Sequence, residues 1–232
     1  MNFMTNICII PARGGSKRIF RKNIKIFLGK PIIAYSIEAA IDSGIFDEVM
    51  VSTDDAEIAE IALQYGAKVP FMRSNKNAND FATTYEVIEE VIESYKKRGQ
   101  SFDQACCIYP CAPFISTKKL VEAARKLDKF ETVLPIVQYG FPIQRALKKN
   151  EADSVSFIQP EFELSRSQDL NESFHDAGQF YFFNLKSLFK NKSVLSENTG
   201  CVVLSEIEVQ DIDNEIDWKL AELKYKLLYG VS

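Results

Sequence analysis

The strongest constraint on the fold is the regular alternation of strand-like and helix-like segments over the first 140 residues. Apolar, strand-like runs recur at residues 6–10, 47–53, 67–72, 103–110 and 131–139. Between them lie segments with helical spacing of apolar residues, at residues 31–44, 54–66, 83–99 and 116–130. This alternation is typical of a mostly parallel sheet with helices on both faces, because parallel strands need crossover connections. We therefore predict an α/β fold.

The pattern changes between residues 140 and 170, where short alternating pieces are separated by turn formers and have no helical period. We predict a small antiparallel arm inserted there. The remaining segments read as strands at residues 178–185, 201–205 and 208–212, a short helix at 185–191 and a final amphipathic helix at 215–230. A chain of 232 residues with this organisation is expected to form one domain, spanning residues 1–232.

Composition excludes several classes of function. The net charge of -4 argues against a general binder of nucleic acid or anionic membranes, which would carry a basic excess over a whole face. The sequence has no apolar stretch of the ~20 residues that a membrane span needs, and its beginning does not match a signal peptide. The five cysteines show neither paired zinc-ligand spacing nor an even disulfide set. We expect a cytoplasmic protein without nucleic-acid or membrane partners.

A basic loop follows the first predicted strand. Five cations, at Arg13, Lys17, Arg18, Arg21 and Lys22, surround adjacent glycines. Ligands of open α/β sheets bind beyond the carboxyl ends of the strands, and glycine amides with basic side chains suit phosphate. The loop matches neither GxxxxGK[ST] nor GxGxxG, which disfavours P-loop NTPases and ordinary nicotinamide dehydrogenases. A solvated basic loop is the alternative, and the clustering at a strand end argues against it.

Acidic residues provide a possible second half of a site. In a strand over residues 208–212 and its continuation, Asp211 and Asp213 would point to the same side, and a pair of carboxylates favours Mg²⁺. The alternative is a helix N-terminus, which accounts better for Glu215 or Asp217. Asp54 and Asp55 also end a strand, and Asp55 is equally well explained as a helix cap. A phosphate loop with a metal-binding carboxylate pair is what nucleotidyl transfer requires.

The region around the only histidine, His175, suggests a sugar pocket. A lone histidine is more often structural than catalytic, and no nucleophile is arranged beside it. Asp176 and Gln179 bind hydroxyl and amide groups well, and they adjoin the aromatic run at residues 180–183.

Taken together, these motifs resemble those of the cytidylyltransferases that activate nonulosonic, sialic-acid-like sugars. The resemblance rests on "IIPARGGSKRIFRKNI", "YPCAPF", "LSRSQDL", "HDAGQFYFF" and "DIDNEIDW", which occur in the family's order over essentially the whole chain. Within the family, the "HDAGQFY" segment and Tyr109 look more similar to pseudaminic acid cytidylyltransferases than to the N-acetylneuraminate enzymes. The resemblance implies a Rossmann-like sheet of the nucleotidyltransferase type and a homodimer whose subunits exchange the arm at residues 140–170.

The resemblance also implies roles for particular residues. Arg13, Lys22 and Asp211 would be catalytic, and Asp211 with Asp213 would bind Mg²⁺. The nucleotide would be bound by Ala12, Arg13, Gly15, Ser16, Arg21, Lys22, Asn23, Arg73, Thr83 and Thr84. The sugar would be bound by Tyr109, Arg166, His175, Asp176, Gln179 and Tyr181, with Arg166 able to serve the neighbouring subunit. The chain departs from the family's pattern at Phe20, where proline is usual, and at Asn79-Asp80, where an acidic pair is more usual.

The implied reaction joins CTP to a nonulosonic acid, pseudaminic acid in the first place, and gives the CMP-sugar and diphosphate for surface or flagellar glycan synthesis. The near alternatives are N-acetylneuraminate, legionaminate and 3-deoxy-manno-octulosonate as the sugar. The distant alternative is a nucleotide-binding module without catalysis. A sugar-nucleotide glycosyltransferase is disfavoured, because the "DID" motif comes late in the chain.

Overall fold

A seven-stranded sheet forms the centre of the computed structural model, which describes residues 5–231. The strand order is β11-β6-β10-β5-β1-β4, and β9 pairs with β6. Five strands run parallel: β1 (Asn6–Pro11), β4 (Glu48–Ser52), β5 (Gln104–Ile108), β6 (Thr132–Gln138) and β11 (Thr199–Leu204). The antiparallel strands are β9 (Phe174–Asp176) and β10 (Phe180–Asn184). The predicted mostly parallel α/β sheet is confirmed.

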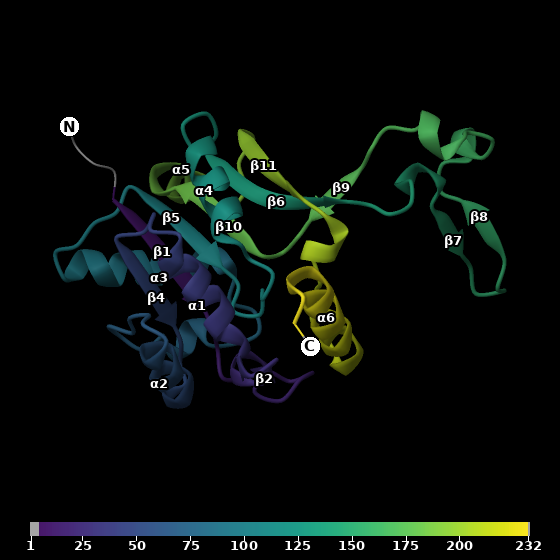
Figure 1. Ribbon diagram of the computed structural model, residues 1–232. Helices are drawn as coiled ribbons and strands as arrows, with labels where there is room; N and C mark the ends of the chain where they lie inside the picture. Colours follow the sequence, from purple (N-terminus) through teal and green to yellow (C-terminus); the bar gives the residue numbers. More distant parts are fainter. Residues whose placement is uncertain (1–4, 232) are drawn as a thin grey trace.

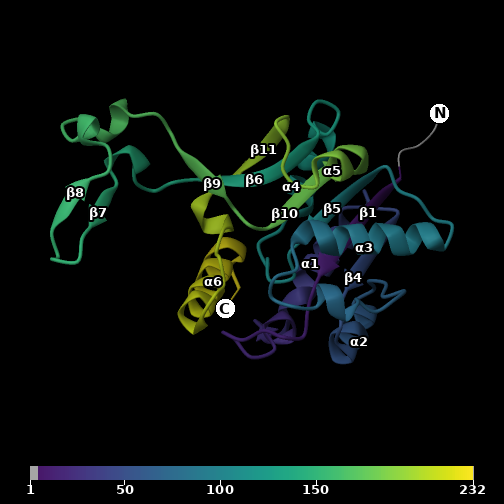
Figure 2. The same cartoon turned by 180° about the vertical axis from the view of Figure 1, so that it is seen from behind.

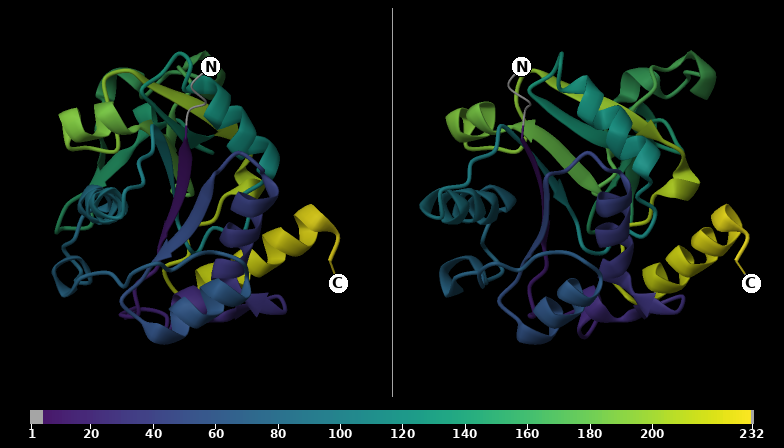
Figure 3. Two further views of the ribbon diagram at one scale, coloured as in Figure 1. Left: turned by 90° about the vertical axis from the view of Figure 1, so that its left-hand side faces the viewer. Right: turned by 60° about the vertical axis from the view of Figure 1, so that its left-hand side comes forward.

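Helices cover both faces of this sheet (Figure 3). Cys8 and Ile10 of β1 pack on the side of α1 (Ile32–Asp42), α2 (Ala56–Gln64) and α4 (Thr117–Lys126). Ile7 and Ile9 pack on the side of α3 (Thr84–Lys97) and α5 (Leu185–Asn191). All four β1 side chains are fully buried, as expected for a strand that is covered on both faces.

The C-terminal helix α6 (Glu215–Tyr229) packs against residues 19–35, between β1 and the first turns of α1, rather than on the sheet (Figures 1 and 2). Its buried Trp218 meets Phe27 edge-to-face, with ring centroids 5.5 Å apart. Phe27 lies in a small hairpin of β2 (Ile26–Phe27) and β3 (Lys30–Pro31), which the sequence patterns did not predict. This third apolar cluster holds α6 against the segment between β1 and α1, near the carboxyl end of β1.

The segment at residues 140–170 leaves the sheet as a projecting arm (Figure 1). Its core is an antiparallel hairpin of β7 (Leu147–Lys149) and β8 (Val155–Phe157), as predicted. Three short 3-10 turns accompany the hairpin, at Ile143–Arg145, Pro160–Phe162 and Ser167–Asp169. Further 3-10 turns elsewhere are η1 (Lys22–Ile24), η2 (Asn75–Asn77) and η6 (Glu206–Glu208).

Two predicted strands are wrong. Residues 67–72 make only one bridge, from Lys68 to Met50, because Pro70 has no N–H with which to continue a ladder. Residues 208–212 form no strand, since Ser205 and Glu208 close a capping box around η6. The carbonyls of Glu208 and Val209 then accept hydrogen bonds from side chains instead of a neighbouring strand, at 2.6 and 2.8 Å.

The prediction of one domain over residues 1–232 includes residues 1–4 and 232, which lie outside the described part. Between residues 5 and 231, no helix combines the length and the apolar character that a bilayer crossing needs.

Candidate active site

A cavity of about 1020 Å³ opens at the carboxyl ends of the parallel strands. Its wall combines the basic loop after β1, the connection that leads into α3, the turn after β5, the break between β9 and β10, and residues 206–212. Ligand sites of open α/β sheets lie at this edge. The cavity therefore joins the segments that the sequence had singled out separately.

The basic loop is held in shape by contacts to α2. Gly14 donates its N–H to the Asp54 carboxylate at 3.0 Å. Asp55 caps α2 through the N–H of Ile58 and also binds the Arg21 guanidinium with both carboxylate oxygens, at 2.5 and 2.9 Å. The Arg21 hydrogen bond lowers the pKa of Asp55 below its usual range. Asp55 is thus a helix cap, as one interpretation of the sequence held, and it also anchors the basic loop without lining the cavity.

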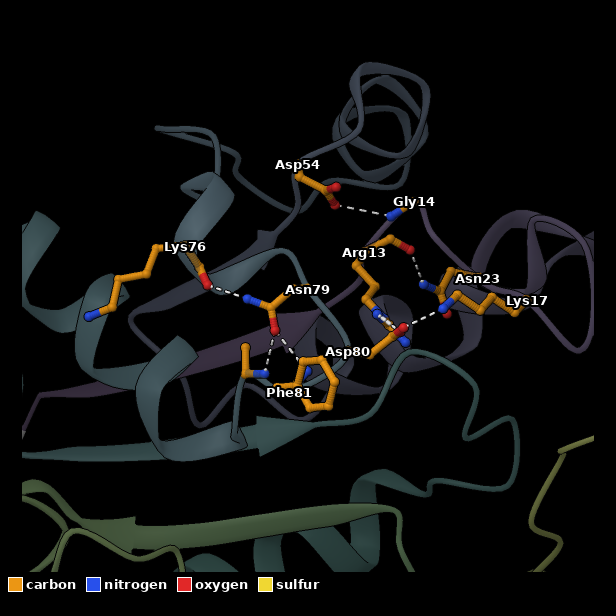
Figure 4. Close-up of polar contacts among 10 residues, drawn as sticks. Arg13, Gly14, Lys17, Asn23, Asp54, Lys76, Asn79, Asp80 and Phe81 are labelled. Atoms are coloured by element: carbon orange, nitrogen blue, oxygen red, sulfur yellow. Dashed lines mark hydrogen bonds and ion pairs between the residues drawn. The ribbon is translucent and has the colours of Figure 1, made fainter.

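A third carboxylate, that of Asp80, contacts the loop from another part of the cavity wall. Asp80 accepts the Arg13 guanidinium on one oxygen and the Lys17 ammonium on the other, the latter at 2.5 Å (Figure 4). Hydrogen bonds lower the pKa of the Asp80 carboxyl, the one from Lys17 most and the one from Arg13 next. Two of the five loop cations are therefore engaged by an acidic residue of the α2–α3 connection.

The loop also reaches the segment before α6, about 190 residues away along the chain. Lys22 donates its ammonium to the carbonyl of Ile212 at 2.7 Å, and Arg18 pairs with Asp213 at 2.6 Å. The Asp211 carboxylate lines the cavity and has no hydrogen bond or ion pair among residues 5–231. The basic loop and the aspartate segment, which the sequence suggested as two halves of one site, are thus in direct contact.

Asp211 and Asp213 provide only some of the ligands that a magnesium ion needs. Asp211 offers an unengaged carboxylate in the cavity, whereas Asp213 would have to exchange Arg18 for a metal. Residues 5–231 contain no group of three or more acidic, histidine or cysteine side chains placed to hold a metal. Mg²⁺ commonly binds one or two carboxylates plus waters and substrate phosphates, and the residues present fit that pattern.

Arg73 and Thr84 line another part of the cavity wall. Arg73 is buried, and it donates to the Ser52 hydroxyl at 3.0 Å and to the Ser52 carbonyl. Burial lowers its pKa, which still leaves the guanidinium charged. The Thr84 hydroxyl shares a hydrogen bond of 3.2 Å with the Tyr109 hydroxyl.

A chain of polar contacts continues from Tyr109 into the other half of the cavity. The buried Tyr181 hydroxyl donates to one Asp176 oxygen at 2.6 Å, and Gly178 donates its N–H to the other at 2.8 Å. Burial and the Asp176 hydrogen bond raise the pKa of Tyr181, so its hydroxyl remains a donor. The remaining acceptor capacity of the Asp176 carboxylate is available to hydroxyl or N–H groups in the cavity.

The predicted site residues fall into two groups. The cavity is lined by Arg13, Ser16, Lys22, Asn23, Arg73, Thr84, Tyr109, His175, Asp176, Gln179 and Asp211. The residues outside the lining are Ala12, Gly15, Arg21, Thr83, Arg166, Tyr181 and Asp213.

The second group has other contacts. Ala12 is fully buried, Arg21 turns toward α2, and Thr83 closes the capping box of α3. Arg166 lies out on the arm and pairs with Asp169 at 2.7 Å, so it is not part of its own chain's cavity.

Sequence reasoning left several lining residues unassigned. Lys17 and Arg18 were recognised only as members of the basic cluster, and Asp80 only as a departure from the family's pattern. Tyr139, whose ring lies 4.8 Å from that of His175, and Lys224 carried no signal, because each is an ordinary residue in its own segment. Only the spatial neighbourhood identifies them.

Comparison with known proteins assigns the class. The chain belongs to the cytidylyltransferase family, whose model matches residues 7–223. It is 43% identical over 226 residues to the pseudaminic acid cytidylyltransferase of Campylobacter jejuni, with 97% of each chain covered. It is 31% identical to the CMP-N,N'-diacetyllegionaminic acid synthase of Legionella pneumophila, with 94% of this chain and 95% of that protein covered.

A solved structure supports the fold. A CMP:2-keto-3-deoxy-manno-octonic acid synthetase complexed with CTP superposes with a TM-score of 0.69 at 17% identity, covering 98% of this chain and 100% of that one. The predicted nucleotidyltransferase-like sheet is confirmed.

Proposed function

We propose that this cytidylyltransferase couples CTP to a nonulosonic acid and releases diphosphate. Pseudaminic acid is the substrate that we favour. The observation that carries the proposal is the single cavity in which the basic loop and the unengaged carboxylate of Asp211 face the same space. The 43% identity to a pseudaminic acid cytidylyltransferase over nearly the whole chain supports the choice of sugar.

The reaction is an in-line displacement at phosphorus. The C2 hydroxyl of the sugar attacks the α-phosphorus of CTP, the bond to the β-phosphate oxygen breaks, and the hydroxyl proton passes to a base, for which Asp211 is our candidate. Arg13 and Lys22 bind the phosphates and stabilise the departing diphosphate. Arg73 and Thr84 bound the space for the cytidine, and Asp176 and Gln179 that for the sugar.

We further propose Mg²⁺ as the cofactor, held by Asp211 and, after release of Arg18, by Asp213. When bound, the ion would neutralise charge on the phosphate oxygens. Lys22 fixes the backbone between the two aspartates through the Ile212 carbonyl, which keeps this segment beside the loop.

We also propose a homodimer in which Arg166 serves the partner's cavity. The arm carries Arg166 away from its own cavity, and an isolated two-stranded hairpin is marginally stable in water. A reducing, cytoplasmic location is proposed as well, since all five cysteines are free thiols.

The deciding experiment measures diphosphate release from CTP and Mg²⁺ with pseudaminic, legionaminic, N-acetylneuraminic and 3-deoxy-manno-octulosonic acids in turn. We expect the highest kcat/KM with pseudaminic acid. Preference for another acid would change the substrate, and no release with any of them would leave a nucleotide-binding module.

Asp211→Asn tests the role of the carboxylate in the same assay. We expect a loss of about 10²-fold or more in kcat, a magnitude typical of removing one group that stabilises charge in a transition state. Asp128→Asn, which changes an exposed residue outside the cavity lining, is the matched control and should retain wild-type turnover. Unchanged turnover in Asp211→Asn would exclude this residue from the chemistry.

A further inference from the structure

Asp80 has no place in the proposed chemistry, yet it engages two cations of the phosphate-facing loop. Arg13 binds one of its carboxylate oxygens and Lys17 the other. All three side chains line the cavity (Figure 4). A carboxylate that receives one cation on each oxygen occupies the same donors that two phosphate oxygens would use.

The turn that carries Asp80 is built to present it. Asn79 accepts the N–H groups of Phe81 and Ala82 at 2.7 and 3.0 Å and donates its amide to the Lys76 carbonyl at 2.6 Å. The Thr83 capping box fixes the chain directly after this turn. The position of Asp80 therefore follows from local hydrogen bonds on both sides, independently of the cations that it meets.

The opposite side of the contact is equally defined. The backbone carbonyl of Arg13 accepts the Asn23 amide at 2.9 Å, and the next residue, Gly14, is bound by Asp54. The ion pairs themselves remain accessible to solvent, with side-chain exposure of 38% for Asp80 and 77% for Lys17. Exposed pairs of this kind are weak, so a ligand that carries several negative charges can displace the carboxylate.

We propose that Asp80 is a built-in competitor of the nucleotide's phosphate groups: it holds Arg13 and Lys17 in the ligand-free protein, and a polyphosphate has to displace it. The inference rests on the proposed function in taking the polyphosphate to be that of CTP. Because the competition acts on any ligand that needs both cations, it weakens the binding of the product diphosphate as well as that of the substrate. Asp80 thus favours release of diphosphate after turnover.

Binding of inorganic tripolyphosphate, measured by titration calorimetry with EDTA present, tests the inference without turnover. Asp80→Asn removes the charge and keeps the shape, and we expect the Kd for tripolyphosphate to fall by about three- to tenfold, as the loss of two exposed ion pairs allows. The Kd for CTP and the inhibition constant for diphosphate should fall by a similar factor. Cytidine, which has no phosphate, should bind both proteins equally.

Glu122→Gln is the matched control. It removes one negative charge and an ion pair of 3.0 Å to Lys126 on α4, outside the cavity, so its tripolyphosphate affinity should equal that of the wild type. An equal melting temperature of Asp80→Asn and wild type shows that the fold is retained.

If Asp80→Asn bound tripolyphosphate with the same affinity as the wild type, the inference would be overturned. Weaker binding by the variant would also overturn it, because Asp80 would then contribute to binding. Failure of the proposed enzyme function would show separately, as absence of diphosphate release while the tripolyphosphate result stands.

Discussion

Tyr181 illustrates how a buried side chain outside the cavity can orient a residue that lines it. Its hydroxyl donates to Asp176, and its raised pKa keeps it protonated over the ordinary working range. Asp176 therefore presents a fixed acceptor to the space proposed for the sugar. In this arrangement Asp176 would contact the substrate, and Tyr181 is a positioning residue.

Tyr181→Phe should raise the KM for the sugar acid about tenfold and leave the KM for CTP unchanged, because a hydrogen bond to a charged group contributes about 1.5–3 kcal/mol. Initial rates with each substrate varied in turn measure both constants. Tyr85→Phe is the matched control, since it removes a comparable bond of 2.6 Å to Glu89 on α3. Equal effects on both KM values would point to a general loss of structure instead.

Asp55 predicts a dependence of stability on pH. The folded-state pKa of its carboxyl lies below the usual value, chiefly through the Arg21 hydrogen bond. The stabilisation is therefore complete above the unfolded-state pKa of ~3.9 and is lost as pH falls through the lower folded-state pKa.

Asp55→Asn keeps the helix cap but loses the ion pair, and we expect the free energy of unfolding to fall by about 2 kcal/mol at pH 7. The difference in the free energy of unfolding between the variant and the wild type should shrink below pH ~3.9. Urea denaturation of both proteins from pH 7 down to below this value measures that difference. Glu57→Gln removes the more exposed partner of Arg21 and should lower the free energy of unfolding by less than about 1 kcal/mol. A pH-independent difference would exclude the linkage.

At the scale of elements, the basic loop depends on close packing against the start of α2. A Cβ at Gly14 would lie 2.6 Å from an Asp55 carboxylate oxygen, whereas a Cβ at Gly15 would meet nothing within 4 Å. The two adjacent glycines therefore have different structural roles, although they are equivalent in the sequence motif.

Gly14→Ala should lower the free energy of unfolding by about 1–3 kcal/mol, the usual cost of overpacking, because Asp55 cannot move without releasing Arg21 or the helix cap. Gly15→Ala should leave the stability within about 0.5 kcal/mol of wild type. Thermal and urea unfolding of the two variants test this contrast. Equal stability of the two proteins would show that Asp55 adapts freely.

Sequence patterns predicted most elements because their signals are local. The apolar run at 6–10 and the Thr83 cap with Glu86 each identify an element by neighbouring residues alone. The prediction of a strand at residues 208–212 was wrong. The local alternation of apolar and polar residues favours a strand, but the backbone carbonyls there accept hydrogen bonds from the distant side chains of Gln179 and Lys224. Asp80 stayed unassigned for the same reason, since its partners are more than 60 residues away.

At the scale of the whole molecule, exposed apolar side chains occur on the arm and on α6, among other places. The arm exposes Leu147, Val155, Ile158 and Leu164, and α6 exposes a stripe at Ile216, Leu220, Leu223 and Leu227. Exposed apolar groups in continuous patches often mark interaction surfaces. Both surfaces fit the proposed homodimer, in which the arm reaches the partner.

Subunit mixing tests that proposal. Arg166→Ala and Asp211→Asn should each be inactive alone, but an equilibrated one-to-one mixture should recover about a quarter of wild-type turnover if Arg166 acts across a two-fold dimer. Half of the dimers would then be mixed, and each mixed dimer would have one intact site. Sedimentation velocity should show a dimer for every variant. If subunits have exchanged and activity is not recovered, Arg166 does not act in the partner's cavity. It then acts only within its own chain or has no role in turnover.

The hydrogen bond from Lys22 to Ile212 joins the first loop to one of the last segments of the fold. During synthesis on a ribosome, the basic loop emerges long before Asp211 has been added to the chain. A nascent chain can therefore complete most of its sheet before the segment that carries Asp211 has left the ribosome. With the role proposed above for Asp211, turnover would require this late segment to be docked against the basic loop.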